Sequence, residues 1–251
     1  MADKTFAHGQ AAYDVCFDWG PTGAAAIAVG ADLAVVVDVL SFTTTLSVAA
    51  QRGVTVFPYR WRDATAEQYA ADRDATLARG RSEPSGVTLS PASVLAAPDL
   101  ERLVLPSPNG SSISFGLAES GMTVVGACLR NRTAVARWLA PRIEAGSRLA
   151  VVAAGERWPD GSLRPAVEDL WGAGAVLAAL VDLGVSGLSP EAEQAAAAFT
   201  AAEPALRDHM WACASGRELD AIRFGDDVRV ASELDASDVV PVLAGEAFRP
   251  E

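Results

Sequence analysis

Carboxylate, hydroxyl and amide side chains recur in this sequence beside or just after short apolar runs. The acidic positions are Asp38, inside the run 33–39, and the adjacent pair Glu168 and Asp169. Carboxylates are hard oxygen donors, which suit Mg²⁺ better than a softer metal. The hydroxyl, amide and glycine positions are candidates for binding a phosphate or sulfonate, and they are Thr43, Thr44, Thr45, Asn109, Gly110, Ser111, Ser112 and Asn131. A divalent cation beside an anion site is the equipment for phosphoryl transfer or phosphate ester hydrolysis.

Short strands alternating with helices must position these residues. The apolar runs that predict strands are 33–39, 54–59, 101–107, 122–129 and 148–155. Strands that are apolar on both faces and alternate with helices indicate a largely parallel sheet covered on both sides. Ligands of such sheets bind beyond the carboxyl ends of the strands, where helix N-termini offer free N–H groups. We therefore expect the acidic and the anion-binding residues to meet at one edge of the sheet.

The remaining stretches complete an α/β chain. Residues 66–79, 166–183 and 189–217 have helical patterns, whereas 226–243 predicts one or two final strands. Glycines that predict helix ends are Gly53, Gly80, Gly121, Gly146 and Gly184. The length of 251 residues fits one domain over 1–251, with two closely packed lobes as the variant of that expectation.

Each of these motifs also has a plain structural reading. Threonines at a helix start are ordinary capping residues, and Asp38 suits the same role. The sequence PNG at 108–110 is a turn signal, and Glu168 with Asp169 favours the helix macrodipole. The repetition of such segments at successive strand ends is what favours a functional site.

Composition excludes several classes of function. The net charge of −12 argues against nucleic acid or an anionic membrane surface as partner. No apolar run reaches the ~20 residues that span a bilayer, and residues 1–10 lack the apolar region of a secretory signal. The three cysteines, Cys16, Cys128 and Cys213, are far apart and odd in number, so we expect a reducing cytoplasm. Only two histidines are present, which excludes a His-rich metal centre.

Several catalytic motifs are absent or incomplete. There is no GxSxG and no P-loop signature, and the second aspartate that aspartyl-phosphate phosphatases need is missing two residues after Asp38. The segment CLRNRTA at 128–134 has Ala134 where a cysteine phosphatase loop needs Arg, so Cys128 is interpreted as a small buried side chain. The glycine pattern GAGA at 172–175 has no strand before it and is interpreted as close helix packing.

Taken in order, the segments resemble a known family, the Mg²⁺-dependent 2-phosphosulfolactate phosphatases of coenzyme M biosynthesis. The match is carried by VVVDVLSFTTTL (35–46), PSPNGSS (106–112), VVGACLRNRTAVA (124–136) and the blocks AAGE and VEDLWGAG within 153–174. The resemblance implies a three-layer α/β/α fold with a largely parallel or mixed central sheet. It also implies Mg²⁺-dependent hydrolysis of 2-phosphosulfolactate to sulfolactate and phosphate, with Asp38, Glu168 and Asp169 on the metal side.

This sequence departs from the family pattern near the expected anion site. Ser41 and Phe42 stand where the family usually has Arg and a small residue, and the segments around Arg81 and Leu89 also differ. Guanidinium groups suit phosphate and sulfonate, so Arg81, Arg130 or Arg132 are the candidates to compensate. A related phospho-hydroxy acid is therefore the alternative substrate.

Two functions of different class follow. The first is a cytoplasmic phosphatase that acts on a small anionic phosphoester with Mg²⁺, in which a metal-activated water attacks phosphorus and Asp38 or Glu168 places the metal or the water. The second is a non-catalytic anion-binding or regulatory protein on the same fold. The sequence does not specify the oligomeric state, and a homodimer is only a working assumption.

Overall fold

Nine strands form one sheet in the computed structural model, which describes residues 9–60, 64–81, 83 and 86–251. The strands of this sheet are β1 (Val15–Trp19), β2 (Leu33–Val37), β3 (Thr55–Tyr59), β4 (Thr76–Leu77), β5 (Arg102–Pro106), β6 (Thr123–Ala127), β7 (Leu149–Ala153), β10 (Pro241–Ala244) and β11 (Ala247–Pro250). A separate hairpin comprises β8 (Glu156–Arg157) and β9 (Leu163–Arg164).

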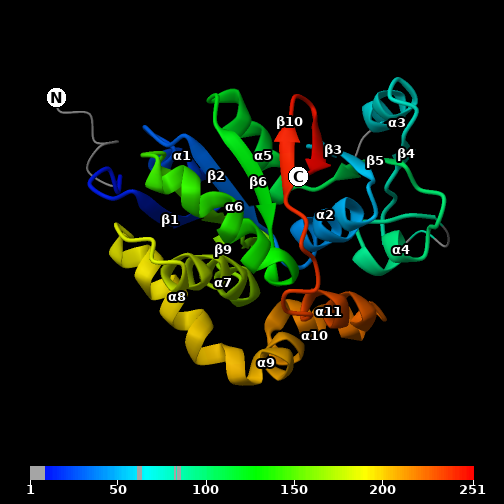
Figure 1. Ribbon diagram of the computed structural model, residues 1–251. Helices are drawn as coiled ribbons and strands as arrows, with labels where there is room; N and C mark the ends of the chain where they lie inside the picture. The colour runs from blue at the N-terminus through cyan, green and yellow to red at the C-terminus, as the bar shows by residue number, and fades with distance from the viewer. Residues whose placement is uncertain (1–8, 61–63, 82, 84–85) are drawn as a thin grey trace.

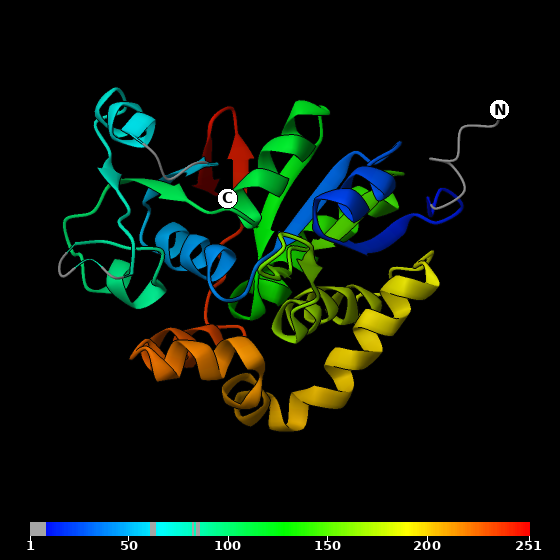
Figure 2. The same ribbon diagram turned by 180° about the vertical axis from the view of Figure 1, so that it is seen from behind.

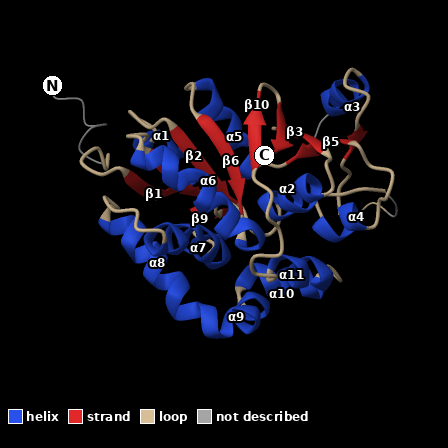
Figure 3. Ribbon diagram, viewed as in Figure 1, coloured by secondary structure: helices blue, strands red, loops and turns tan. Residues whose placement is uncertain are grey.

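Helices connect most of these strands. They are α1 (Gly20–Ile27), α2 (Phe42–Gln51), α3 (Ala64–Ala71), α4 (Pro91–Leu95), α5 (Gly110–Glu119), α6 (Arg132–Glu144), α7 (Val167–Asp182), α8 (Pro190–Ala202), α9 (Leu206–Ala212), α10 (Ala214–Ala221) and α11 (Gly225–Ala231), with short 3-10 turns η2 (Leu129–Asn131) and η3 (Glu203–Ala205). Figure 3 shows how the strands are surrounded by helices. None of the described helices is long and apolar enough to cross a membrane.

The sheet is mixed, with two parallel blocks joined by a hairpin. The strand order is β1-β7-β2-β6-β10-β11-β3-β5-β4. Strands β1, β7, β2 and β6 are mutually parallel, as are β3, β5 and β4. The β10–β11 hairpin pairs antiparallel with β6 on one side and with β3 on the other, so the second block is inverted relative to the first.

The inversion of the block β3, β5 and β4 determines which strand ends lie next to one another. Each link through the hairpin is a single residue pair, Val242 with Val125 and Phe248 with Val56. In Figure 1, β3 and β5 lie at a steep angle to β2 and β6. The carboxyl end of β5 is thereby brought beside that of β2, where the N–H of Gly110 donates to Asp38 over 3.0 Å. The expected convergence is therefore real for β2, β5 and β7, but it does not come from a single parallel edge.

Helices cover both faces of the sheet, which confirms the α/β class and its three layers. Alternate residues of β2 point to opposite sides: Val35 and Val37 enter one hydrophobic core, and Ala34 and Val36 enter the other. Helices α6, α7 and α8 contribute to the first core, while α1, α2 and α5 contribute to the second. Figures 1 and 2 show the two sides, with α8 to α11 forming an arc along the lower edge of the view.

Small residues on α7 allow close packing of helices, as the glycine pattern at 172–175 predicts. A Cβ on Gly174 would lie 2.1 Å from the carbonyl oxygen of Ala195 on α8, and one on Gly172 would lie 2.5 Å from Val39. Both distances are shorter than any real contact, so only glycine permits these approaches. The interpretation of this pattern as a packing motif is confirmed.

The prediction of final strands over 226–243 is wrong for its first half. Residues 225–231 form α11, and only Pro241–Ala244 and Ala247–Pro250 are strands. The alternation of Val228 and Val230 with charged residues imitates a strand, but Asp226 and Asp227 in the first turn favour a helix start. Burial of Asp227, Val228, Val230 and Ala231 on one side then stabilises the helix.

The helix predicted over 66–79 is also shorter than expected. It ends at Ala71, and Asp74 adopts the left-handed conformation with φ 47°. Residues Thr76 and Leu77 instead pair with β5 as the edge strand β4, so Gly80 does not end a helix. No element was predicted for residues 9–32, and this segment contains β1 and α1.

Candidate active site

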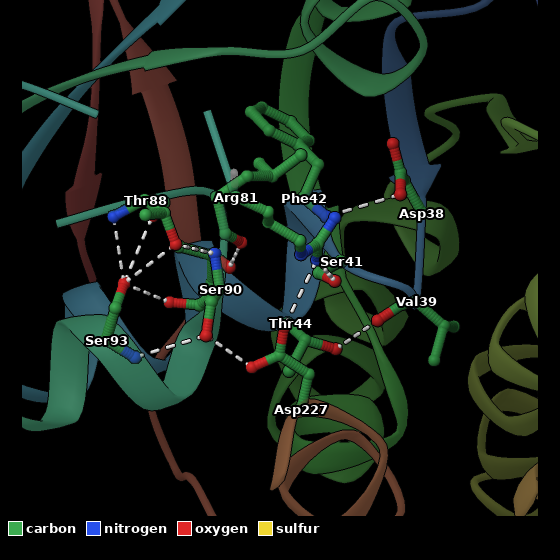
Figure 4. A network of polar contacts seen from close by, with 12 residues as sticks. Asp38, Val39, Ser41, Phe42, Thr44, Arg81, Thr88, Ser90, Ser93 and Asp227 are labelled. Carbon is green, nitrogen blue, oxygen red and sulfur yellow. Dashed lines mark hydrogen bonds and ion pairs between the residues drawn. The ribbon is translucent and has the colours of Figure 1, made fainter. Parts of the chain in front are cut away.

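Asp38 lies one residue beyond β2, in the loop that leads into α2. Its side chain is 6% exposed. One carboxylate oxygen accepts the N–H of Phe42 over 3.2 Å, and the other accepts the N–H of Gly110 over 3.0 Å (Figure 4 shows the first contact). A Cβ on Gly110 would lie 2.2 Å from the Phe42 ring and 2.9 Å from Asp38, so glycine is required for this approach. The first turns of α2 and α5 therefore fix the orientation of Asp38.

Asp169 joins the loops after β2 and β7 from the first turn of α7. Its carboxylate oxygens accept the N–H of Val39 over 2.7 Å and the N–H of Gly155 over 2.8 Å. Gly155 has φ 66°, a left-handed conformation that favours glycine. Asp169 is nearly fully buried, and its two hydrogen bonds hold the ends of β2 and β7 together.

Two glutamates complete an acidic cluster with these aspartates. Glu168 is 2% exposed, and after burial its charge is the next cause that raises the pKa of the Cys213 thiol, at the start of α10, to about 11. Glu156, the first residue of β8, accepts a hydrogen bond from the amide of Asn109 over 3.1 Å. We refer to Asp38, Glu156, Glu168 and Asp169 as the acidic cluster.

Burial and mutual repulsion raise the pKa of three of these carboxyls, those of Asp38, Glu156 and Asp169. Burial raises the pKa of Asp38 to about 6, assisted by the charge of Glu168 and opposed by the N–H groups of Phe42 and Gly110. Burial also raises the pKa of Glu156 to about 7, and the charges of Asp38 and Glu168 add to the effect. Burial, followed by the charges of Asp38 and Glu168, raises the pKa of Asp169 well above its usual value.

No ion pair compensates the acidic cluster within the described part of the chain. Its donors are carboxylate oxygens, the type that Mg²⁺ prefers. Among the residues that the structure describes, however, no three Asp, Glu, His or Cys side chains are arranged to enclose a metal ion. Mg²⁺ is commonly held by only one or two carboxylates, with waters and substrate phosphate completing its shell. The donor set fits that mode of binding.

A cavity of about 350 Å³, which we call the inner pocket, opens beside this cluster. Asp38, Asn109 and Glu156 lie on its wall together with two basic residues, Arg60 and Arg81. The rest of the wall is Leu40, Ser41, Leu89, Ser107 and Pro108. Carboxylates and guanidinium groups in one small cavity can bind a cation and an anion side by side.

Arg81 is held at this pocket by a buried polar network (Figure 4). Its Nη2 donates to the hydroxyl of Ser41 and, over 3.2 Å, to the carboxylate of Asp227 on α11. Asp227 is fully buried, and its other oxygen accepts the hydroxyl of Ser90, the residue that caps α4. The Nε of Arg81 is buried and has no partner among the described residues. The network therefore fixes the guanidinium while leaving part of its donor capacity unused.

Comparison with known protein families decides the assignment. A family model described as "2-phosphosulpholactate phosphatase" matches residues 25–246, nearly the whole chain. The chain belongs to the 2-phosphosulfolactate phosphatase family. This confirms the resemblance found in the sequence, and it supports a phosphatase function, that of a phosphoric monoester hydrolase.

The three threonines of this family member do not reach the inner pocket. Thr43 donates its hydroxyl to the carbonyl of Asp38 over 2.8 Å, Thr44 to Val39 over 2.7 Å and Thr45 to Leu89 over 2.7 Å. All three side chains are fully buried. Their hydroxyl donors secure the loop around Asp38, and the expectation that these residues bind the substrate anion stays a prediction.

The residues after β6 also lie away from the inner pocket. Asn131 accepts the N–H of Cys128 over 2.9 Å and donates to the carbonyls of Gly126 and Val239. Arg130 is itself buried; it forms an ion pair with Glu233 and donates a hydrogen bond to Gln51. Asn131 and Arg130 thus secure the C-terminal segment to the end of β6, and their expected role in binding the anion stays a prediction. Arg132 likewise pairs with Glu203 and Asp235.

The segment after β5 has a divided role. Asn109 lines the inner pocket as expected, but the N–H of Gly110 is occupied by Asp38. The hydroxyl of Ser111 is buried and donates to the carbonyl of Leu105, while Ser112 lines a separate groove between α1 and α5. Ser111 and Ser112 therefore lie outside the inner pocket and Gly110 is a partner of Asp38, while their expected role in binding the anion stays a prediction.

Sequence reasoning placed Glu156 at a strand end without giving it a role, and it missed three further residues around this site. Arg60 follows β3, so the rule that strand ends carry ligand-binding residues could have found it. Asp227 and Arg164 had no such signal, because tertiary packing alone brings α11 and β9 to the pocket region.

Cys128 is predicted to be dispensable for catalysis. Its thiol is fully buried, and burial raises its pKa, so that a thiolate nucleophile is disfavoured. We expect Cys128→Ser to retain phosphate release within about twofold, at a stability cost of about 1–2 kcal/mol for the buried hydroxyl. Steady-state rates and thermal unfolding measure both quantities. A hundredfold loss of rate in a folded variant would show that a covalent cysteine mechanism operates.

Proposed function

We propose that the protein is a Mg²⁺-dependent phosphatase that hydrolyses a small acidic phosphate monoester in the inner pocket. 2-Phosphosulfolactate, which would give sulfolactate and phosphate, is the leading substrate because of the family to which the chain belongs. The observation that carries the proposal is the arrangement of the pocket, in which the buried Asp38 and the half-buried Glu156 lie on the same wall as Arg60 and Arg81.

Arg81 is the residue best suited to bind the phosphoryl group. A guanidinium presents several donors in a fixed plane, which matches the oxygens of phosphate. Ser41 and Asp227 already restrict Arg81, so less side-chain entropy is lost when an anion binds. Arg60 adds a second positive charge, although it is paired with Glu119 at the protein surface over 3.3 Å.

Asp38 and Glu168 would hold the cation, with Asp169 keeping the two loops in place through its backbone contacts. Mg²⁺, when bound, would supply positive charge that stabilises the phosphoryl oxygens during transfer. In the reaction a water oxygen forms a bond to phosphorus and the bond from phosphorus to the ester oxygen breaks. Glu156, a carboxyl with a pKa raised to about 7, would donate its proton to the departing ester oxygen. One proton of the attacking water would then return to Glu156, and the other would stay on the released phosphate.

One specific observation favours the alternative function, that of a non-catalytic anion-binding or regulatory protein. No three acidic, His or Cys side chains enclose a metal position among the described residues. An anion-binding or regulatory protein that lacks turnover would need Arg81 and Arg60 but no metal. The acidic cluster disfavours this alternative, because uncompensated buried carboxylates repel a phosphate ligand.

Phosphate release from a panel of small phosphoesters separates the two functions. We expect turnover of 2-phosphosulfolactate or a related phospho-hydroxy acid with Mg²⁺, at least about a hundredfold above the rate in EDTA, since a catalytic metal contributes several kcal/mol. Activity should return when excess Mg²⁺ is added after EDTA. Binding of these esters without phosphate release under any metal condition would establish the non-catalytic function.

A further inference from the structure

A second cavity, of about 430 Å³, adjoins the inner pocket, and we call it the outer pocket. The two share Leu40, Arg81 and Glu156 as a common boundary. The hairpin β8–β9 forms one side of the outer pocket and α10 forms the other. A molecule bound in the inner pocket therefore has room to extend past Arg81 toward these elements.

Two arginines of the hairpin side, Arg157 and Arg164, line the outer pocket. Neither forms an ion pair with any residue that the structure describes, in a protein of net charge −12. Two carboxylates also line the pocket: Glu156 at the boundary, and Glu218 on α10. With Arg81 included, basic groups outnumber acidic groups around this cavity.

Arg164 is held in place at the pocket. Its Nη2 donates to the hydroxyl of Ser215 over 3.3 Å, and its guanidinium lies 5.8 Å from the ring centre of Trp158. Arg157 donates to the carbonyl of Gly161 across the hairpin turn over 3.2 Å. These contacts restrict the side chains but leave most of their donors unused, since a guanidinium has five N–H groups. The start of α10, at Ala214 and Ser215, adds partial positive charge beside them.

We propose that the outer pocket binds a second anionic group of the substrate, a carboxylate or a sulfonate, while the phosphoryl group occupies the inner pocket. Arg157 and Arg164 are then specificity-determining residues, and Arg81 separates the two anions. This inference rests on the proposed function, because it takes the inner pocket as the phosphoryl site. It predicts that esters without a second acidic group are poor substrates.

Four esters with the same phosphate position test the proposal. They are 2-phosphosulfolactate, 2-phospholactate without the sulfonate, 2-phosphopropane-1-sulfonate without the carboxylate, and isopropyl phosphate without either. We expect Arg164→Gln to lower kcat/KM about tenfold to hundredfold for esters that carry the recognised acidic group, the range of charge-assisted hydrogen bonds. Isopropyl phosphate should be unaffected. Comparison of the two singly acidic esters identifies whether the carboxylate or the sulfonate is recognised.

Matched variants and a binding measurement complete the test. Arg157→Gln should act in the same direction, while Arg207→Gln, on the exposed surface of α9, should change nothing. Equal losses for all four esters, or no loss for any, would overturn the proposal. If the wild-type protein hydrolyses none of them, the proposed function fails, and calorimetric binding of sulfolactate decides the inference alone. Weaker binding by Arg164→Gln would support the outer pocket, and unchanged binding would overturn it.

Discussion

Replacement of Asp38 by asparagine is expected to lower phosphate release by about 10³-fold or more while the protein remains folded. The change preserves the shape of the side chain but removes a negative charge from the acidic cluster. Loss of a metal-binding carboxylate costs several kcal/mol in the transition state, and each 1.36 kcal/mol corresponds to a tenfold change in rate.

Folding of Asp38→Asn should survive because two effects oppose each other. One of the N–H groups of Phe42 and Gly110 keeps an oxygen acceptor, while the other faces the new NH₂ group and loses its partner, at about 1–3 kcal/mol. Removal of a buried charge that burial and Glu168 already disfavour offsets part of that cost.

The matched control for this variant is Asp208→Asn. Asp208 is exposed on α9, far along the chain from the pocket residues, so its replacement should leave the rate unchanged. Initial rates of phosphate release and thermal unfolding curves are measured for both variants. Wild-type turnover by the Asp38→Asn variant would show that Asp38 has no role in catalysis.

The second large effect is a loss of stability in the metal-free protein as the pH rises. The pKa values of Asp38, about 6, and Glu156, about 7, lie above those of the unfolded chain, so between pH 4 and pH 7 the folded state binds more protons. The free energy of unfolding is therefore highest at the acidic end of this range and falls as the pH passes through the folded pKa values. The fall is on the order of 3 kcal/mol for each of the two carboxyls, as a shift of about two pKa units implies.

Mg²⁺ should oppose this loss because it binds the ionised carboxylates. Its stabilising effect should be small at pH 5 and reach about 2.7 kcal/mol near pH 7.5 at a hundred times its dissociation constant. Denaturant titrations between pH 5 and pH 8, with Mg²⁺ or with EDTA, measure both trends. Glu156→Gln should remove part of the pH dependence, since it deletes one of the titrating groups. A metal-free protein that gains stability across this range would contradict the account.

The sequence predicted the strands and carboxylates that form the site better than it predicted the roles of the surrounding hydroxyl groups. The apolar run before Asp38 identified β2, and the strand-end rule placed Asp38, Asn109 and Glu168 in one region. The threonines of α2 could not be assigned, because the same hydroxyls serve equally for capping and for anion binding. Only the carbonyls of Asp38, Val39 and Leu89, brought near by folding, show which role they have.

The features that the sequence did not predict depend on contacts between residues far apart in the chain. The inversion of β3 and β5 depends on the β10–β11 hairpin, which is formed almost 200 residues after β3 begins. The position of Arg81 depends on Asp227, 146 residues further along the chain. Neither contact leaves a local pattern in the sequence, so only the three-dimensional arrangement could reveal that Arg81 is held at the pocket.

A crystal structure of the protein soaked with Mn²⁺, in place of Mg²⁺, and inorganic phosphate tests the central claim most directly. The account predicts an anomalous peak for Mn²⁺ beside Asp38 and Glu168, with phosphate in the inner pocket against Arg81. Phosphate bound instead at the first turn of α2 or beside Asn131, or Mn²⁺ bound away from the acidic cluster, would contradict it.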